Sequence, residues 1–320
     1  MWLTWRAAME SALYGEQGFY LRERPSGHFR TSVSASAVFA EAVLALVVET
    51  DVALGSPDRF DLVDIGAGEG VLVSRILEAA PPTLRDRLAV TAVDLSPRPD
   101  DLHERVTWTP HIPHGIHGLA IANEWLDNIP LDVAEQTPDG PRLVMVDTET
   151  GEERLGDPVG PDDLRWLDRW WPLSRTGSRA EIGRSRDAAW AAVIVRLARG
   201  RAIAIDYSHP VDNRPPCGTL TGYRDGSVVP PIPDGTCDIT AHVAIDACAE
   251  AGERAGALST GLSTQREVLR GLGITGARPP LDLAGTDPRG YLRALARASE
   301  EAELISTSGL GGFGWITQIR

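Results

Sequence analysis

The chain has 320 residues, 42% of them hydrophobic, and a formal net charge of −14 at pH 7. This length suits one large domain or two modest ones, and the negative charge excludes a nucleic-acid backbone as the main partner. The sequence has no secretory signal and no uninterrupted apolar run that would cross a membrane, and its three cysteines form no CxxC pair. We therefore expect a reduced, cytoplasmic protein without a membrane partner and without a metal site.

The N-terminal region, residues 1–58, is predicted to contain two helices separated by an irregular segment rich in Gly, Ser and Arg. Apolar residues recur at helical spacing in Trp2–Leu13 and in Ala37–Val48. Ser34 or Ser36 is placed to cap the second helix.

Residues 59–132, and again 201–207, contain short apolar runs typical of buried strands. The predicted strands are Phe60–Ile65, Ala89–Leu95, Val106–Trp108, Leu119–Ala122 and Arg201–Tyr207, with a helix at Val71–Ala80. Apolar strands without clean alternation indicate a parallel sheet covered on both faces. The pattern therefore predicts an α/β fold with a Rossmann-like, doubly wound and mostly parallel sheet.

Two inserts, residues 133–200 and 208–261, interrupt this alternation. The first is predicted to hold a hairpin, a Trp-rich helix (Asp162–Trp171) and a long helix ending near Arg199, and the second a Pro/Gly-rich loop and a helix. Residues 262–320 return to the main domain, where we expect an antiparallel strand pair within Glu303–Ile319, turning at Gly311-Gly312. We expect the inserts to form a helical cap that carries substrate selectivity.

A glycine turn follows the first predicted strand, in the sequence DIGAGEG. Gly66, Gly68 and Gly70 give the spacing GxGxG, whereas a dinucleotide site requires GxGxxG and would need glycine where Val71 stands. A phosphate-binding loop of the Walker type is also excluded, because the chain contains no lysine. A turn of this kind lets a ligand approach the backbone and the free N–H groups of a helix N-terminus.

Acidic residues end the first two predicted strands. Asp64 would repel a pyrophosphate but suits the ammonium group of a methionine moiety, and Asp94 can accept hydrogen bonds from both hydroxyls of a ribose. Together with the glycines, this pattern resembles the first two motifs of class I S-adenosylmethionine methyltransferases.

A second polar group follows the fourth predicted strand, in NEWLDNIP (123–130). The carboxyl end of a central strand lies beside the point where an open α/β sheet binds its ligands. Asn123, Glu124 and Asp127 would there hold a nucleophilic nitrogen in line with a sulfonium methyl group. The alternative is a helix cap made by Asp127 or Asn128.

The chain as a whole resembles the MidA-like methyltransferases, which include the mitochondrial arginine methyltransferase needed for respiratory complex I assembly. The motifs that carry this resemblance run in order along the chain: ALYGEQGFY, GHFRTS, DIGAGEG, NEWLDNIP, AEIGRS, AIDYSHP, GTLTGY, DGTCDITAHV, LSTQREVLRGLGI and GLGGFGWIT. Motifs in order over nearly the full length are far more specific than one glycine turn.

The resemblance implies a class I methyltransferase that uses S-adenosyl-L-methionine to methylate a protein side-chain nitrogen, with arginine as the acceptor. By position, the cofactor would bind to Asp64, Gly66, Gly68, Gly70, Asp94 and Asn123. An N-terminal lid containing Gly27, Thr31 and Ser32 would fold over it. Asn123, Glu124 and Asp127 would form the catalytic group, facing the methyl group and the acceptor. Since carboxylates orient a guanidinium through paired hydrogen bonds, we also take Glu181 from the insert as a candidate third carboxylate for the acceptor.

Two parts of the lid region depart from the family pattern. His28 stands where an acidic residue is usual, and Val33–Ser36 replace a proline and an acidic residue. Two other functions therefore remain open: a non-catalytic cofactor-binding or assembly protein, and a methyltransferase that acts on a small molecule.

Overall fold

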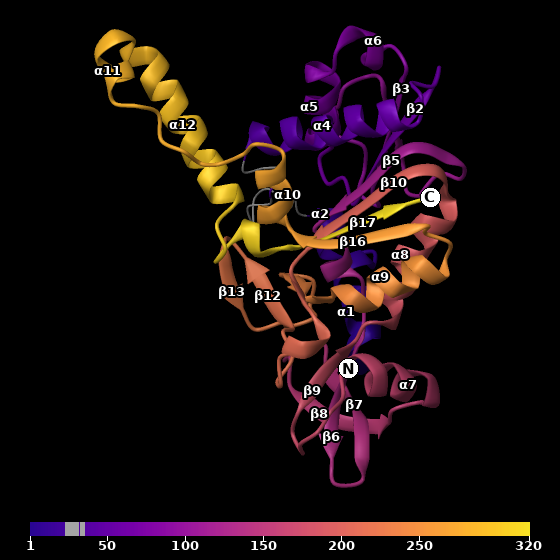
Figure 1. Cartoon of the computed structure of the whole chain (residues 1–320). Coiled ribbons are helices and arrows are strands. Elements are labelled where there is room, and N and C mark those ends of the chain that lie inside the picture. Colours follow the sequence, from indigo (N-terminus) through magenta and orange to yellow (C-terminus); the bar gives the residue numbers. More distant parts are fainter. Residues whose placement is uncertain (23–31, 33–35) are drawn as a thin grey trace.

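The computed structural model describes residues 1–22, 32 and 36–320. Its centre is a seven-stranded sheet in the order β16-β17-β10-β5-β2-β3-β4 (Figure 1). The strands are β2 (Phe60–Ile65), β3 (Leu88–Val93), β4 (Val106–Thr109), β5 (Ile116–Asn123), β10 (Leu197–Asp206), β16 (Ser259–Thr264) and β17 (Gly314–Ile319). β17 alone runs antiparallel to its neighbours β10 and β16, and the pairs between β10 and β4 are parallel. The mostly parallel, doubly wound sheet predicted from the sequence is confirmed.

The five predicted strands of the parallel part are confirmed, but the C-terminal strand pair is wrong. Pro288–Leu304 forms the helix α12, and Leu310–Gly312 forms a 3-10 turn. The strand β17 that follows pairs with β10 and β16, which are distant in sequence. Gly311 and Gly312 suggested a local hairpin, whereas the partners of β17 are strands from distant parts of the sequence. β16, which spans the predicted boundary at residue 261, was not identified from the sequence.

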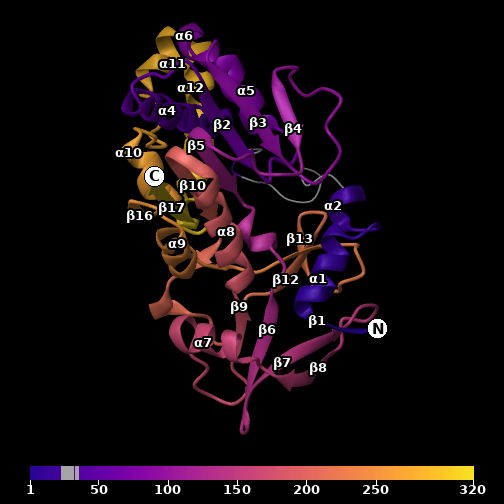
Figure 2. The ribbon, with the colours of Figure 1, turned by 90° about the vertical axis from the view of Figure 1, so that its right-hand side faces the viewer.

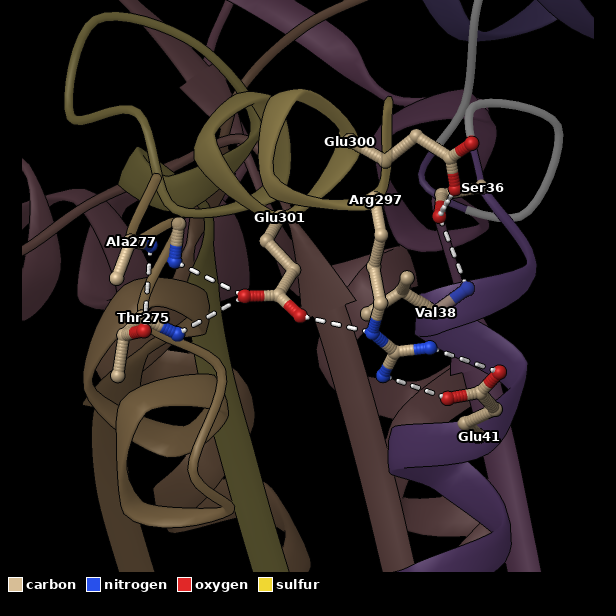
Figure 3. Close-up of polar contacts among 9 residues, drawn as sticks. Ser36, Val38, Glu41, Thr275, Ala277, Arg297, Glu300 and Glu301 are labelled. Carbon is tan, nitrogen blue, oxygen red and sulfur yellow. Dashed lines mark hydrogen bonds and ion pairs between the residues drawn. The ribbon is translucent and has the colours of Figure 1, made fainter. Parts of the chain in front are cut away.

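Helices cover both faces of the sheet, because side chains of the buried strands alternate between two apolar cores. α4 (Ala37–Ala53) and α5 (Val71–Ala79) pack on one face with Leu62, and α8 (Arg184–Arg196) and α9 (Ile245–Arg254) pack on the other with Val63. Ser36 is the N-cap of α4, since its Oγ accepts a hydrogen bond from the Val38 N–H at 2.9 Å. The same Oγ donates to Glu300 of α12 at 2.6 Å (Figure 3).

The first insert joins the N-terminus in a separate layer below the main sheet (Figures 1 and 2). This layer is a five-stranded antiparallel sheet of β1 (Trp2–Thr4), β6 (Asp132–Thr137), β7 (Gly140–Asp147), β8 (Glu153–Pro158) and β9 (Arg179–Ile182). The helices α1 (Trp5–Tyr14) and α7 (Pro161–Trp170) belong to it. The cap therefore contains more strand than the helical cap predicted from the sequence.

The remaining elements are short or lie at the edges. They are α2 (Phe19–Arg22), α6 (Pro82–Arg85), α10 (Gln265–Gly271), α11 (Asp282–Thr286), β11 (Ser208–His209), β12 (Thr221–Arg224), β13 (Ser227–Val229), β14 (Asp238–Thr240) and β15 (Val243–Ala244). In the part of the chain that the structure describes, no helix has the length and apolar character of a membrane span.

Candidate functional site

The glycine turn connects β2 to α5 and opens onto a cavity. Gly66, Gly68 and Gly70 have φ angles of +70°, +58° and +68°, which L side chains rarely adopt. A Cβ on Gly66 would lie 2.8 Å from the Trp125 ring, whereas a Cβ on Gly68 would have no atom of the described residues within 4 Å. Gly66 is therefore required for packing, and Gly68 leaves open space beside the backbone.

Asp94 follows β3 and fixes the turn from the side. One carboxylate oxygen accepts a hydrogen bond from the Gly68 N–H at 2.8 Å, and the other accepts from the N–H and the hydroxyl of Ser96 at 2.8 and 2.7 Å. Asp64 is buried at the end of β2, and burial together with the charge of Asp94 raises the pKa of Asp64 to about 7. A bound cation would reverse that shift, because an opposite charge nearby favours the ionised carboxylate.

The cavity has a volume of about 680 Å³ and lies between the carboxyl ends of β2 and β5. This is the switch point of the sheet, since the chain continues from β2 to β3 on one side and enters β5 on the other. Its lining includes the glycine turn, Asp64, Asp94, Asn123 and Glu124. Residues predicted from three separate motifs therefore meet around one space.

Glu124 projects from the turn that follows β5. Its φ is +52°, and its N–H donates to the Ile205 carbonyl at 2.8 Å, which fixes this unusual backbone. Oε1 accepts hydrogen bonds from the Ser32 N–H and from Asn123 Nδ2, both at 3.0 Å. Burial, with a smaller contribution from Asp127, raises the pKa of Glu124 to about 8 despite these two bonds.

Asn123 presents an unsatisfied acceptor beside Glu124. Its Oδ1 is buried and has no hydrogen-bond partner among the residues described. Buried polar groups are normally paired, so this oxygen is a candidate acceptor for a ligand N–H or O–H.

Asp127 lies deeper than Glu124, in the 3-10 turn Leu126–Asn128, and is not among the residues that line the cavity. Its Oδ2 accepts from the Thr240 hydroxyl at 2.7 Å. Asp206, at the end of β10, accepts the backbone N–H groups of Trp125, Leu126 and Asp127 at 2.9–3.2 Å. The sequence analysis missed Asp206, although an acidic residue ending a strand in AIDYSHP was the available signal.

Arg186 is a second residue that the sequence analysis missed. It is 1% exposed and donates hydrogen bonds to four backbone carbonyls, those of Asp127, Ile129, Ala241 and His242. These carbonyls belong to NEWLDNIP and DITAHV, so one guanidinium joins the two motifs. The signal in the sequence was an Arg directly after the motif AEIGRS, at the start of the predicted long helix.

The N-terminal helices close one side of the cavity. The hydroxyl of Tyr14 donates to the Asn128 carbonyl at 3.1 Å, and the hydroxyl of Tyr20 donates to Asp238 at 2.8 Å. Asp238 also accepts from Asn128 Nδ2 at 2.9 Å, and burial raises its pKa to about 7. The motif ALYGEQGFY therefore acts as a wall of the site.

Other residues singled out in the sequence lie in different surroundings. Gly27 and Thr31 lie outside the described residues, whereas Ser32 contacts Glu124 and donates through its hydroxyl to Gln265 at 3.0 Å. Glu181 lines a separate cavity of about 440 Å³, where the N–H groups of Thr219 and Leu220 donate to it. Within the described ranges, no three His, Cys, Asp or Glu side chains form a group that would hold a metal ion.

Comparison with known proteins identifies the family. A family model described as S-adenosyl-L-methionine-dependent methyltransferases matches residues 43–263. The chain is 24% identical to the mitochondrial protein arginine methyltransferase NDUFAF7 of Xenopus tropicalis, over 81% of this chain and 69% of the relative. It is 25% identical to the protein of the same name from Danio rerio, over 85% of this chain and 72% of the relative.

Solved structures agree with this assignment. A crystal structure from Burkholderia thailandensis, bound to S-adenosyl-homocysteine, aligns with a TM-score of 0.82 at 28% identity and covers 100% of this chain and 88% of that one. A native structure from the same organism aligns with a TM-score of 0.81 at 29% identity, covering 100% of this chain and 87% of that one. The family model spans more than half of the chain, so this protein belongs to the S-adenosyl-L-methionine-dependent methyltransferases and uses S-adenosyl-L-methionine as its cofactor.

Proposed function

We propose that this enzyme methylates the guanidinium group of a protein arginine, and that Glu124 binds the acceptor. The observation that carries the proposal is a carboxylate, Glu124, which lines the cofactor cavity at the end of β5. Its pKa is raised to about 8 by burial and by neighbouring carboxylates. The relatives from Xenopus tropicalis and Danio rerio carry the name of a protein arginine methyltransferase.

The residues around the cavity fit the cofactor. We assign its binding to Asp64, Gly66, Gly68, Gly70, Asp94 and Asn123. Asp64 would face the ammonium group, and Asp94 would accept from the ribose hydroxyls. The space beside Gly68 and the Asn123 oxygen, neither of which is filled or bound by the described residues, are the features that a ligand would use. When bound, S-adenosyl-L-methionine supplies a methyl group on a positively charged sulfur.

Glu124 would orient the acceptor and neutralise its charge. A carboxylate binds a planar guanidinium through two parallel hydrogen bonds, which fixes the direction of its nitrogens. Holding the nitrogen in line with the methyl group contributes roughly 7–11 kcal/mol when the geometry is near attack. Asn123 would keep Glu124 in place through the bond to Oε1, and Asp127 would add negative charge behind it.

The reaction forms a nitrogen–carbon bond, breaks the carbon–sulfur bond and releases one proton from the acceptor nitrogen. Glu124, which would hold the acceptor nitrogen, would lie within reach of this proton. We therefore also assign the proton to Glu124, from which water removes it after product release.

The proposal is tested with Glu124→Gln, in which the new side chain keeps the hydrogen-bonded oxygen and loses the charge. The variant is incubated with isotopically labelled cofactor and proteins from the source cell, and mass spectrometry of digested peptides locates the label. We expect label on arginine with wild type, at least a hundredfold less with the variant, and unchanged affinity for S-adenosyl-homocysteine. Label on a free metabolite, on lysine, or on nothing would contradict the proposal.

A further inference from the structure

A second cavity lies between the five-stranded sheet of the cap and the loop that precedes β12. Its volume of about 440 Å³ is within the range of sites that hold small ligands. The described residues that line it do not overlap with those that line the cofactor cavity. The motifs AEIGRS and GTLTGY, which methyl transfer leaves without a role, contribute Glu181 and Gly218 to this lining.

Glu181, on β9, has one carboxylate oxygen without a partner. The residue is 2% exposed, and its Oε1 accepts hydrogen bonds from the N–H groups of Thr219 and Leu220 at 2.6 and 3.0 Å. Gly218 has a φ of +73°, and a Cβ there would collide with this carboxylate. Oε2 has no hydrogen-bond partner among the residues described. Since buried polar groups are normally paired, the missing partner is a donor from outside the chain.

The charges near the cavity favour a cationic donor. Arg179 is the cation among the described lining residues, and it already donates to Glu135 at 2.8 Å and to Glu153 at 2.6 Å. Arg186 lowers the pKa of Glu181, but burial has the larger effect and raises it. Three carboxylates and two guanidinium groups leave one negative charge, which a cation beside Glu181 would balance.

Trp5 adds an aromatic ring to the lining. Its indole nitrogen donates to Glu153 Oε1 at 2.8 Å, which fixes the ring beside a carboxylate. Aromatic rings attract guanidinium and ammonium groups, and carboxylate oxygens bind the planar guanidinium with defined geometry. The lining therefore matches a guanidinium in both charge and chemistry.

We propose that this second cavity binds a guanidinium group, with Glu181 Oε2 as its acceptor. Glu181 would then hold a second cation, and not the group that Glu124 presents to the cofactor. Two sources share this chemistry: another arginine of the protein that is methylated, and a free arginine derivative.

The helix α1 relates the two cavities, because it runs from the cap layer toward the main sheet (Figure 2). Trp5 at its start lines the second cavity, and Tyr14 at its end lines the cofactor cavity. These residues are about 14 Å apart along the helix axis, which corresponds to about four residues of an extended peptide. We therefore take a second arginine of the acceptor protein as the source, and this choice alone rests on the proposed function.

Cys217 makes occupancy of the cavity measurable. It is exposed and lines the cavity, whereas Cys237 and Cys248 are buried, so modification of the native protein by a maleimide reports on Cys217. With the cofactor cavity saturated by S-adenosyl-homocysteine, we expect N-acetyl-arginine amide to slow this modification. The uncharged citrulline analogue should leave the rate unchanged.

Glu181→Gln keeps an acceptor oxygen for the two N–H groups and loses the charge. The concentration of N-acetyl-arginine amide that gives half protection should rise at least about tenfold in this variant. Glu149→Gln is the matched control, because Glu149 is exposed on the turn between β7 and β8 and does not line the cavity. Circular dichroism melting should show that both variants are folded.

Two substitutions of Cys217 test the site while Glu181 is retained. Cys217→Arg supplies a guanidinium from the cavity lining itself, so calorimetric titration should show no binding of N-acetyl-arginine amide. Cys217→Ser should bind it as strongly as the unsubstituted chain. Both titrations use the Glu124→Gln background, so that the second cavity is the site measured.

A peptide with two arginines four residues apart distinguishes the sources. If the ligand is a second arginine of the acceptor protein, the peptide should protect Cys217 at least about tenfold more strongly than the single-arginine probe, through linked binding at both cavities. Glu124→Gln should remove that advantage, and so would a failure of the proposed arginine methylation. Equal protection by the two probes would assign the cavity to a free arginine derivative. The proposal is overturned if N-acetyl-arginine amide leaves the modification rate unchanged, if the citrulline analogue protects equally, or if Glu181→Gln is protected like wild type.

Discussion

Replacing Glu124 by Gln should stabilise the protein without ligands, and increasingly so as the pH rises. The pKa of Glu124 is raised from 4.5 to about 8 by burial, so the folded state holds the proton more tightly than the unfolded state. Stability from this group is fully present below pH 4.5 and is lost as the pH rises to about 8. Gln carries no titrating proton and escapes that loss.

The size of the effect follows from the shift. With the full shift in the pKa of Glu124, ionisation would lower the free energy of unfolding of wild type by roughly 2 kcal/mol at pH 6 and roughly 5 kcal/mol at pH 9. The Glu124 side chain is partly open to the cavity, so we expect about half of this, roughly 1 and 2 kcal/mol. For a chain of 320 residues, these values raise the Tm by about 1.5 °C at pH 6 and about 3 °C at pH 9.

Differential scanning calorimetry at the two pH values measures the difference directly. Glu16→Gln is the control, because Glu16 is exposed on the loop after α1. A Glu124→Gln variant that melts below wild type, or that differs from wild type equally at both pH values, would refute the assignment of Glu124 as a carboxylate strained by burial. The pH stays above 5 because the sequence pI is about 5.0, where association would obscure melting.

Three further outcomes concern the cofactor site and its support. Asp94→Asn should weaken S-adenosyl-homocysteine binding at least tenfold, or about 1.4 kcal/mol, as measured by calorimetric titration. The reason is that an amide nitrogen replaces one acceptor oxygen of the carboxylate that binds Gly68 and Ser96. Unchanged affinity would contradict the role of Asp94 in cofactor binding. Gly68→Ala should abolish S-adenosyl-homocysteine binding. Gly55 also has a positive φ and open space among the described residues, so Gly55→Ala is the control and should cost only about 1 kcal/mol of stability. Equal cofactor affinity of the two variants would argue against the position of the site. Arg186→Lys should lower the free energy of unfolding by about 3 kcal/mol, because an ammonium group cannot reach all the carbonyls to which the guanidinium donates. A denaturant midpoint equal to that of wild type would contradict this expectation.

The parallel sheet could be predicted because its strands combine local signals. Phe60–Ile65 is an apolar run closed by an acidic residue and a glycine turn, and Leu119–Ala122 precedes a polar group of the same kind. Both runs lie in buried central strands, where composition and burial agree. The glycine spacing likewise predicted a real conformational need, because three positive φ angles occur in this turn.

The parts that were missed depend on partners distant in sequence. β17 pairs with β10 and with β16, and β1 pairs with β7 at a separation of more than a hundred residues. Nothing local distinguishes Trp2–Thr4 from the first turn of a helix, since its strand conformation comes from the register with β7. Asp206 and Arg186 are visible in the sequence as an acidic residue ending a strand and an Arg at the start of a helix, but their roles were missed because their partners are backbone groups of other motifs.

The balance of charge around the site favours a cationic acceptor over a neutral one. Glu124, Asp127, Asp206 and Asp238 all have pKa values raised by burial, and Arg186 is the buried guanidinium beside them, with its hydrogen bonds given to backbone carbonyls. Each raised pKa is a cost to the folded state at neutral pH. A neutral acceptor would leave this cost in place, whereas a guanidinium or ammonium group entering the cavity offsets part of it through attraction in a poorly hydrated space. Of these four carboxylates, Glu124 is the one that lines the cavity, so the cationic acceptor proposed above would offset this cost mainly through Glu124.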